Sequence, residues 1–96
     1  MFARTSSWSG SPEALDKWAE HVAAKVRPFV ARLPGNAGAL FLIDRDAGSA
    51  LTLTLWESEA AAEATDQNAE ASRASTVAAT GVELLRRNRY ELVARV

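Results

Sequence analysis

The sequence contains no cysteine and only one histidine, His21. Without cysteine the chain can form no disulfide framework and no zinc–thiolate or iron–sulfur site, and it offers no thiol nucleophile. A single histidine with no second histidine beside it argues against a metal site. No apolar run approaches the roughly 18 residues that span a bilayer, and the first residues lack the apolar stretch of a secretion signal. We therefore expect a cytoplasmic protein that binds no metal and no membrane.

Neither sign of charge is in excess, because 11 lysines and arginines accompany 12 aspartates and glutamates, for a net charge of −1. Proteins that bind nucleic acid normally carry a basic excess on one face. The densest basic segment here, Arg86-Arg87-Asn88-Arg89, is short. We therefore expect no nucleic-acid partner.

Large apolar side chains are also scarce, although 48% of the residues are hydrophobic. Twenty of the 96 residues are alanine, and nine of these lie between Ala60 and Ala79. A chain of this length forms one domain, residues 1–96. A small domain that is short of bulky apolar side chains gains by burying further surface in an oligomer. The composition therefore favours a homo-oligomer.

The first third of the chain predicts a strand and a helix. Residues 2–8 are expected to form a short strand. Ser11 suits the N-cap of a helix whose first residue is a proline, a position where the missing N–H costs nothing. Apolar residues then recur at steps of three and four from Leu15 to Leu33, which is the spacing of one helix face. Pro28 should bend the last turns of this helix.

The rest of the chain predicts a hairpin, a second helix and a last strand. Residues 39–43 form a continuous apolar run, and residues 51–56 alternate strictly between apolar and polar. A helix is expected from the cap at Ser58 to Ala79, and a strand over residues 84–96. The order β-α-β-β-α-β is that of the α+β ferredoxin-like fold, an antiparallel four-stranded sheet with both helices on one face. Because nothing in the chain covers the other face, we expect a homodimer of two packed sheets.

Three segments resemble the antibiotic biosynthesis monooxygenase-like family of dimeric α/β barrels: Leu33-Pro34-Gly35, Gly38 to Arg45, and Leu53 to Ala61. The junction Trp56-Glu57-Ser58-Glu59 carries the resemblance most clearly. The resemblance implies a dimeric α/β barrel with a pocket in each subunit between the sheet and the helices. Its members include cofactor-free oxygenases of polyketide quinones, haem-degrading enzymes and isomerases. The haem-degrading members use a histidine on the second helix, which this sequence lacks, so we expect no haem and no other cofactor.

The cofactor-free members resemble one another in placing Asn, Trp and Tyr side chains around a quinol-like substrate. The corresponding candidates for catalytic residues here are Trp56, Asn68 and Tyr90. Trp56 lies in a local motif that is similar to the family's, whereas Asn68 and Tyr90 correspond only in the helix or strand on which they are expected. Neutral donors of this kind would hold the anion that forms when a polyphenol loses its proton. The resemblance thus implies a cofactor-independent monooxygenase acting on a small aromatic or polyketide-like molecule.

Four further residues are candidates for substrate binding. Thr52 and Thr54 share the strand face of Trp56 and could donate hydrogen bonds to a flat ligand. Arg4 binds a carboxylate or phenolate if its strand face lines the pocket, and is otherwise a solvated cation. His21 is either a general base or a solvated helix residue. Trp56 itself either lines the pocket or anchors the core.

Two other interpretations stay open. A non-catalytic dimeric module that binds a metabolite or a protein is favoured by the missing base and nucleophile patterns. An activity resembling muconolactone isomerase shares the fold but has no motif here. The alanine-rich helix keeps only Val77 as a large apolar residue. It therefore either packs close to the sheet or leaves an unfilled volume that could hold a ligand.

Overall fold

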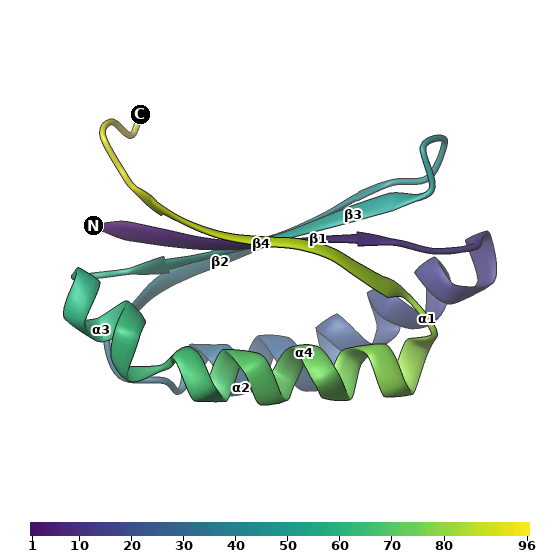
Figure 1. Ribbon diagram of the computed structural model, residues 1–96, viewed down its shortest axis with the longest axis horizontal. Coiled ribbons are helices and arrows are strands. Elements are labelled where there is room, and N and C mark those ends of the chain that lie inside the picture. Colours follow the sequence, from purple (N-terminus) through teal and green to yellow (C-terminus); the bar gives the residue numbers. More distant parts are fainter.

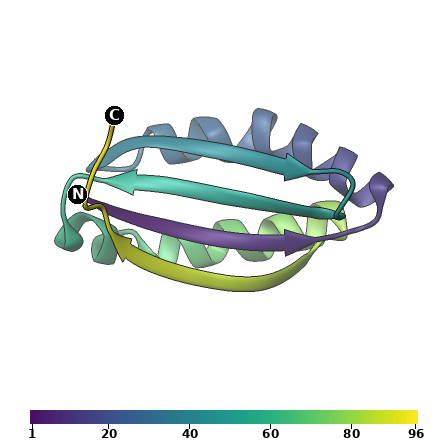
Figure 2. The same ribbon diagram turned by 90° about the horizontal axis from the view of Figure 1, so that it is seen from above.

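The computed structural model describes residues 1–96. Four strands form one antiparallel sheet in the order β2-β3-β1-β4, and all helices cover a single face of it (Figures 1 and 2). No helix is long and apolar enough to cross a membrane. The expected α+β ferredoxin-like fold is confirmed. Its elements are β1 (Phe2–Ser9), α1 (Pro12–His21), a π-helix η1 (Val22–Val26), α2 (Arg27–Ala31), β2 (Asn36–Asp44), β3 (Ser49–Trp56), α3 (Glu59–Ala64), α4 (Asp66–Thr80) and β4 (Glu83–Glu91).

The register of the two central strands decides which side chains face the helices. Arg4 of β1 lies opposite Thr54 of β3, and Ser6 lies opposite Thr52. Because side chains alternate along a strand, these four share one face of the sheet with Trp56. Arg4, Ser6, Thr54 and Trp56 are all buried, so this is the face that the helices cover. The opposite face is open. Leucines of β2 and β3 make one half of it apolar, and Thr5, Ser7, Arg86 and Asn88 of β1 and β4 lie on the other half.

The first helical segment begins as expected but contains a π-helix. The Ser11 hydroxyl accepts a hydrogen bond from the Ala14 N–H at 3.1 Å. Ahead of Pro28 the helix widens over η1, where the Arg27 N–H donates to the Val22 carbonyl, five residues earlier. A proline ring crowds the preceding turn and supplies no N–H, and a wider turn accommodates both effects. The expected bend therefore takes the form of a wide turn that keeps both Val22 and Val26 buried.

The second helical segment is not continuous, and the expectation of one helix over residues 58–79 is wrong. Its cap is as predicted, because Ser58 Oγ accepts from the Ala61 N–H at 3.1 Å. The segment then breaks at Thr65, which separates α3 from α4. In an unbroken helix the Ala62 carbonyl would accept from the Asp66 N–H. Here that carbonyl instead accepts from the Thr65 N–H at 3.2 Å, from the Thr65 hydroxyl at 3.1 Å and from the guanidinium of Arg4, which reaches up from β1.

Helix α4 presents small and polar residues to the sheet. Thr76 and Thr80 are buried, and their hydroxyls donate to the carbonyls four residues earlier at 2.8 and 2.7 Å. Val77, the one large apolar residue of this alanine-rich segment, is exposed. The helix ends at Gly81 in the left-handed conformation, with φ of 81°, as the sequence predicts. The bulky core therefore lies under α1, where Trp8, Leu15 and Trp18 pack together.

The last strand is shorter than expected. β4 ends at Glu91 rather than continuing to Val96, and the Leu92 N–H donates to the Met1 carbonyl at 2.8 Å. The final residues leave the sheet on the side away from the helices (Figure 1).

Candidate functional site

A cavity lies between the sheet and the helices, where α4 contributes Ala69, Ser72, Arg73 and Thr76 to its wall. It measures about 50 Å³, counted as the space open to the centre of a water molecule. On that measure one water needs roughly 10–15 Å³, so this slot, as we call it, has room for a few water molecules. The residues that line it are Arg4, Ser6, Trp8, Trp18, Val22, Val26, Phe29, Val30, Leu33, Thr52, Thr54, Trp56, Ala69, Ser72, Arg73 and Thr76.

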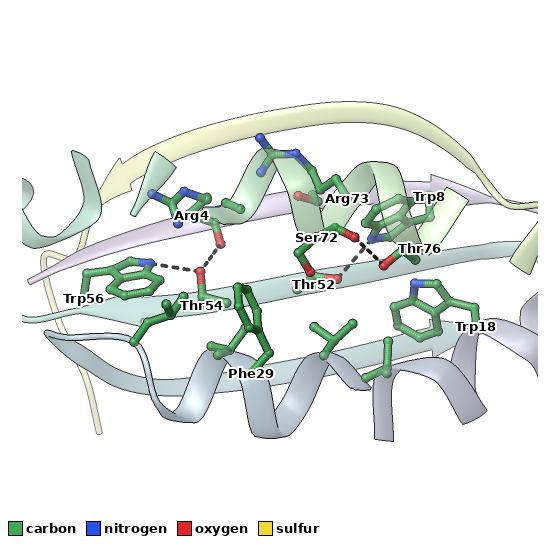
Figure 3. A pocket seen from close by; sticks show the side chains of 16 residues that line it. Arg4, Trp8, Trp18, Phe29, Thr52, Thr54, Trp56, Ser72, Arg73 and Thr76 are labelled. Carbon is green, nitrogen blue, oxygen red and sulfur yellow. Dashed lines mark hydrogen bonds between the residues drawn. The ribbon is translucent and has the colours of Figure 1, made fainter. Parts of the chain in front are cut away.

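All three tryptophans of the chain line this cavity and are buried. Trp8 Nε1 donates to Thr52 Oγ1, and Trp56 Nε1 donates to Thr54 Oγ1, both at 3.0 Å (Figure 3). Trp18 Nε1 is buried and has no hydrogen-bond partner. A buried donor without an acceptor costs about 1–3 kcal/mol. Trp18 therefore carries one unsatisfied N–H group, which lies within the cavity wall and beneath its accessible surface.

Arg4 closes one end of the cavity. Its side chain is only 10% exposed, and it donates to Asp66 Oδ1 at 2.6 Å and to Thr65 Oγ1 at 3.4 Å, besides the Ala62 carbonyl. Its guanidinium carbon lies 5.1 Å from the centroid of the Trp56 ring, within cation–π range. Arg4 is thus not a solvated cation. It lines the cavity while its donors are largely engaged by the junction of α3 and α4.

Arg73 of α4 supplies a second positive charge to the cavity wall. Its Nε is buried and has no hydrogen-bond partner. Burial lowers the pKa of Arg73, and the nearby charges of Arg87 and Arg4 lower it further. No carboxylate, imidazole or phenol lines the cavity, so the slot offers donors and positive charge but no general base. No group of three histidine, cysteine or carboxylate side chains converges anywhere in the chain to hold a metal ion.

The structure brings together four of the residues singled out from the sequence and separates the others. Arg4, Thr52, Thr54 and Trp56 all line the cavity. They meet because β1 and β3 pair in a register that places these residues on one face.

The expected grouping of Trp56 with Asn68 and Tyr90 is not found. Asn68 is exposed on α4, and its neighbour Ala69 faces the cavity instead. Tyr90 is 54% exposed and lies opposite Ala3, on the open face of the sheet. Both residues were assigned only because they lie on the same helix or strand as the corresponding residues of the family. Such an assignment does not say which side of the helix, or which face of the sheet, the side chain occupies.

His21 lies outside the cavity. It lines a groove on the helix side of the molecule, together with Lys25 of η1 and Ser75 of α4. Val26 and Phe29 line both the groove and the cavity, so they form a wall between the two. His21 is therefore separated from the slot by these side chains.

Sequence reasoning missed three residues that shape the site: Trp8, Trp18 and Arg73. Trp18 belongs to the apolar stripe of the first helix, and a stripe does not distinguish a core residue from a cavity wall. Trp8 shares a strand face with Arg4, which was a usable signal. Arg73 gave none, because an arginine in a polar helix usually points to solvent.

Comparison with known proteins identifies the family. Residues 1–77 match the profile of the antibiotic biosynthesis monooxygenase family. No curated protein matches the sequence. A monooxygenase from the gene ActVA-Orf6 of Streptomyces coelicolor, in complex with nanaomycin D, has a similar structure with a TM-score of 0.74 and 16% identity over 99% of this chain and 89% of that one.

Two other solved structures share the fold. SnoaB, a cofactor-independent oxygenase from Streptomyces nogalater, gives a TM-score of 0.66 and 19% identity over 99% of this chain and 95% of that one. A mutant of MhuD with two manganese protoporphyrin IX molecules per active site gives a TM-score of 0.68 and 22% identity over 100% of this chain and 98% of that one. With four fifths of its length matched by the family profile, the chain belongs to the antibiotic biosynthesis monooxygenase family.

Proposed function

We propose that the chain is a cofactor-independent monooxygenase that oxidises a flat aromatic or polyketide-like compound in the cavity. The observation that carries the proposal is a cavity to which all three tryptophans contribute, with the unpaired Trp18 Nε1 buried in its wall. Indole rings stack on flat ligands, and the N–H of Trp18 would orient a ligand oxygen once its side chain turns toward the cavity. Family membership and the likeness to SnoaB and to the ActVA-Orf6 monooxygenase support the same chemistry.

The site would act mainly by stabilising an anion. The substrate hydroxyl or acidic ring carbon loses a proton to water, since no side chain in the cavity can serve as base. Trp18 Nε1 and the positive charge of Arg73 stabilise the resulting anion, and this lowers the barrier to its formation. The electron-rich ring then reacts with O2. For an anthrone-like ring, CH2 becomes C=O, one oxygen atom enters the product and the other leaves as water.

Oxygen consumption with anthrone and with 1,4-dihydroxynaphthalene tests this proposal. We expect Trp18→Phe to lower kcat/KM about tenfold, the effect of one lost hydrogen bond, and to lower the free energy of unfolding by roughly 1–3 kcal/mol, because the smaller ring leaves a void in the core. Trp56→Phe should also lower turnover, with a similar loss of stability because its hydrogen bond to Thr54 is lost. Urea unfolding should show that both variants remain folded at the assay temperature. Gln67→Ala, at an exposed position of α4 outside the cavity, serves as the control and should leave turnover unchanged. Unchanged turnover in both tryptophan variants would refute the proposal.

A non-catalytic binding module is the second candidate, and one observation favours it. The cavity contains no carboxylate, imidazole or phenol that could move a proton. Quenching of tryptophan fluorescence by these compounds, without oxygen consumption above that of the buffer, would identify a module of this kind.

We further propose that the protein is a homodimer built on its open sheet face. Leu40 and Leu42 of β2 are 58% and 49% exposed there, and Leu85 and Tyr90 of β4 are exposed as well. A second copy would bury this apolar surface, and the last residues already extend to that side (Figure 1).

The double variant Leu40→Lys, Leu42→Lys is expected to be monomeric at micromolar concentration, because two charges on each subunit would have to be buried. Sedimentation velocity measures the change. Val77→Lys, at an exposed apolar position on the helix side, is the matched control and should remain dimeric. A monomeric wild-type protein would contradict the proposal.

A further inference from the structure

A second, polar hollow adjoins the cavity and shares Arg4 and Arg73 with it. It offers about 290 Å³, counted in the same way, and no apolar residue lines it. Four arginines and two carboxylates border it, from β1, the start of α4, and β4. They are Arg4, Arg73, Arg87 and Arg89, with Asp66, Glu70 and Asn88.

The arginines of this hollow differ in whether they are paired. Arg4 forms an ion pair with Asp66 at 2.6 Å. Arg89 lies 3.7 Å from carboxylate oxygens of both Glu63 and Asp66. Arg73 and Arg87 have no carboxylate oxygen within 4.0 Å. Two cations therefore border the hollow without a counter-ion.

The position of these two cations connects the hollow to the slot. Figure 3 shows Arg73 reaching from α4 toward Arg4 and β4, with its guanidinium at the edge of the cavity. Arg87 lies opposite Ser6 of β1, and Ser6 lines the cavity. A group attached to a ring in the slot would thus lie beside Arg4 and Arg73, the two residues that the slot and the hollow share.

The electrostatics of the unliganded protein favour an anion at this point. Burial and the charges of Arg87 and Arg4 oppose the charge on Arg73, while Glu70 and Asp66 only partly offset them. The Nε of Arg73 is in addition buried without an acceptor. A carboxylate in the hollow would separate the like charges, and the planar fork of a guanidinium matches a carboxylate in geometry.

We propose that the ligand is a flat aromatic acid, whose ring fills the slot and whose carboxylate binds Arg73 and Arg87 in the hollow. The inference rests on the proposed function, because it takes the cavity to be the substrate site. It adds the substrate class, an aromatic carboxylic acid in place of a neutral quinol, and two residues that select it.

A matched pair of ligands tests the inference: 1,4-dihydroxy-2-naphthoic acid and its neutral parent 1,4-dihydroxynaphthalene, titrated under nitrogen with tryptophan fluorescence as the signal. The acid should bind at least tenfold more tightly than the parent, as expected for charge-assisted hydrogen bonds. Arg73→Gln and Arg87→Gln should each weaken binding of the acid about tenfold, and Arg87→Gln, which lies outside the cavity, should leave binding of the parent unchanged. Arg45→Gln, at an exposed arginine paired with Asp16 on the far side of the fold, should change neither.

The outcomes separate this inference from the proposed function. Equal affinity for the acid and the parent, or an acid affinity that neither glutamine variant changes, would overturn the inference and leave the proposed function intact. Absence of binding for both compounds would overturn the proposed function as well. Because Arg87 is exposed on β4, its glutamine variant is expected to fold, and it decides the result if Arg73→Gln proves unstable.

Discussion

Arg4→Met is expected to lower the free energy of unfolding by about 2–3 kcal/mol, the range for hydrogen bonds made by a charged group. The substitution keeps the apolar stem but removes the charged hydrogen bonds to the Ala62 carbonyl and to Asp66, although that carbonyl keeps the Thr65 N–H and hydroxyl as donors. It also removes the cation from the Trp56 ring. Urea unfolding followed by circular dichroism measures the loss as a lower midpoint at unchanged slope.

The ion pair of Arg45 with Asp16 provides a matched control for Arg4. Its N–O distance, 2.7 Å, is nearly the same as the 2.6 Å of Arg4 and Asp66, but its side chains are 57% and 63% exposed. Exposed pairs contribute about 0–1 kcal/mol, so Arg45→Met should change stability by less than about 1 kcal/mol. Equal losses in the two variants would show that burial of Arg4 does not matter.

Ala69→Leu is expected to lower turnover about 100-fold, because the larger side chain would displace the substrate or exclude it from the cavity. The added carbon atoms would enter a cavity of about 50 Å³ from the α4 side. Because they fill empty space, the free energy of unfolding should stay the same or rise by roughly 1 kcal/mol. Steady-state oxygen consumption and urea unfolding, measured on the same preparation, give both results.

Ala74→Leu is the control for this prediction. Ala74 lies on the same helix but is exposed and lines no cavity, so the larger side chain should leave turnover unchanged. Full turnover by Ala69→Leu would show that the reaction takes place elsewhere.

The fold was predictable because its signals are local. Ser11 and Gly81 mark helix ends through their own side chain or backbone, and the alternation over residues 51–56 fixes a strand with two different faces. That alternation by itself also places Thr52, Thr54 and Trp56 on a common face. The open apolar face follows from the same alternation, since the intervening leucines must point the other way.

The errors at the site have a long-range cause. Helix α4 takes its rotation from the break at Thr65, and the break depends on Arg4, which is distant in the sequence but donates to the Ala62 carbonyl and to Thr65 in the fold. The sequence of the second helical segment alone therefore does not predict the break. Similarly, the face of the sheet on which Tyr90 lies depends on how β4 pairs with β1, and that pairing is irregular between Ser7 and Trp8. The polar hollow could not be predicted from the sequence either, because Arg73 and Arg87 come together only in the folded chain.

The strand order also has a consequence for how the chain is made. β4, the last element, pairs only with β1, the first, so one edge of a central strand stays open until residues 83–91 are available. Contacts between distant segments form slowly, and an unpaired strand edge is prone to associate with other chains. During synthesis the hairpin of β2 and β3 can pair with β1 and receive α1 well before the ribosome releases β4. We therefore expect nascent chains that lack the last strand to be compact but prone to aggregation.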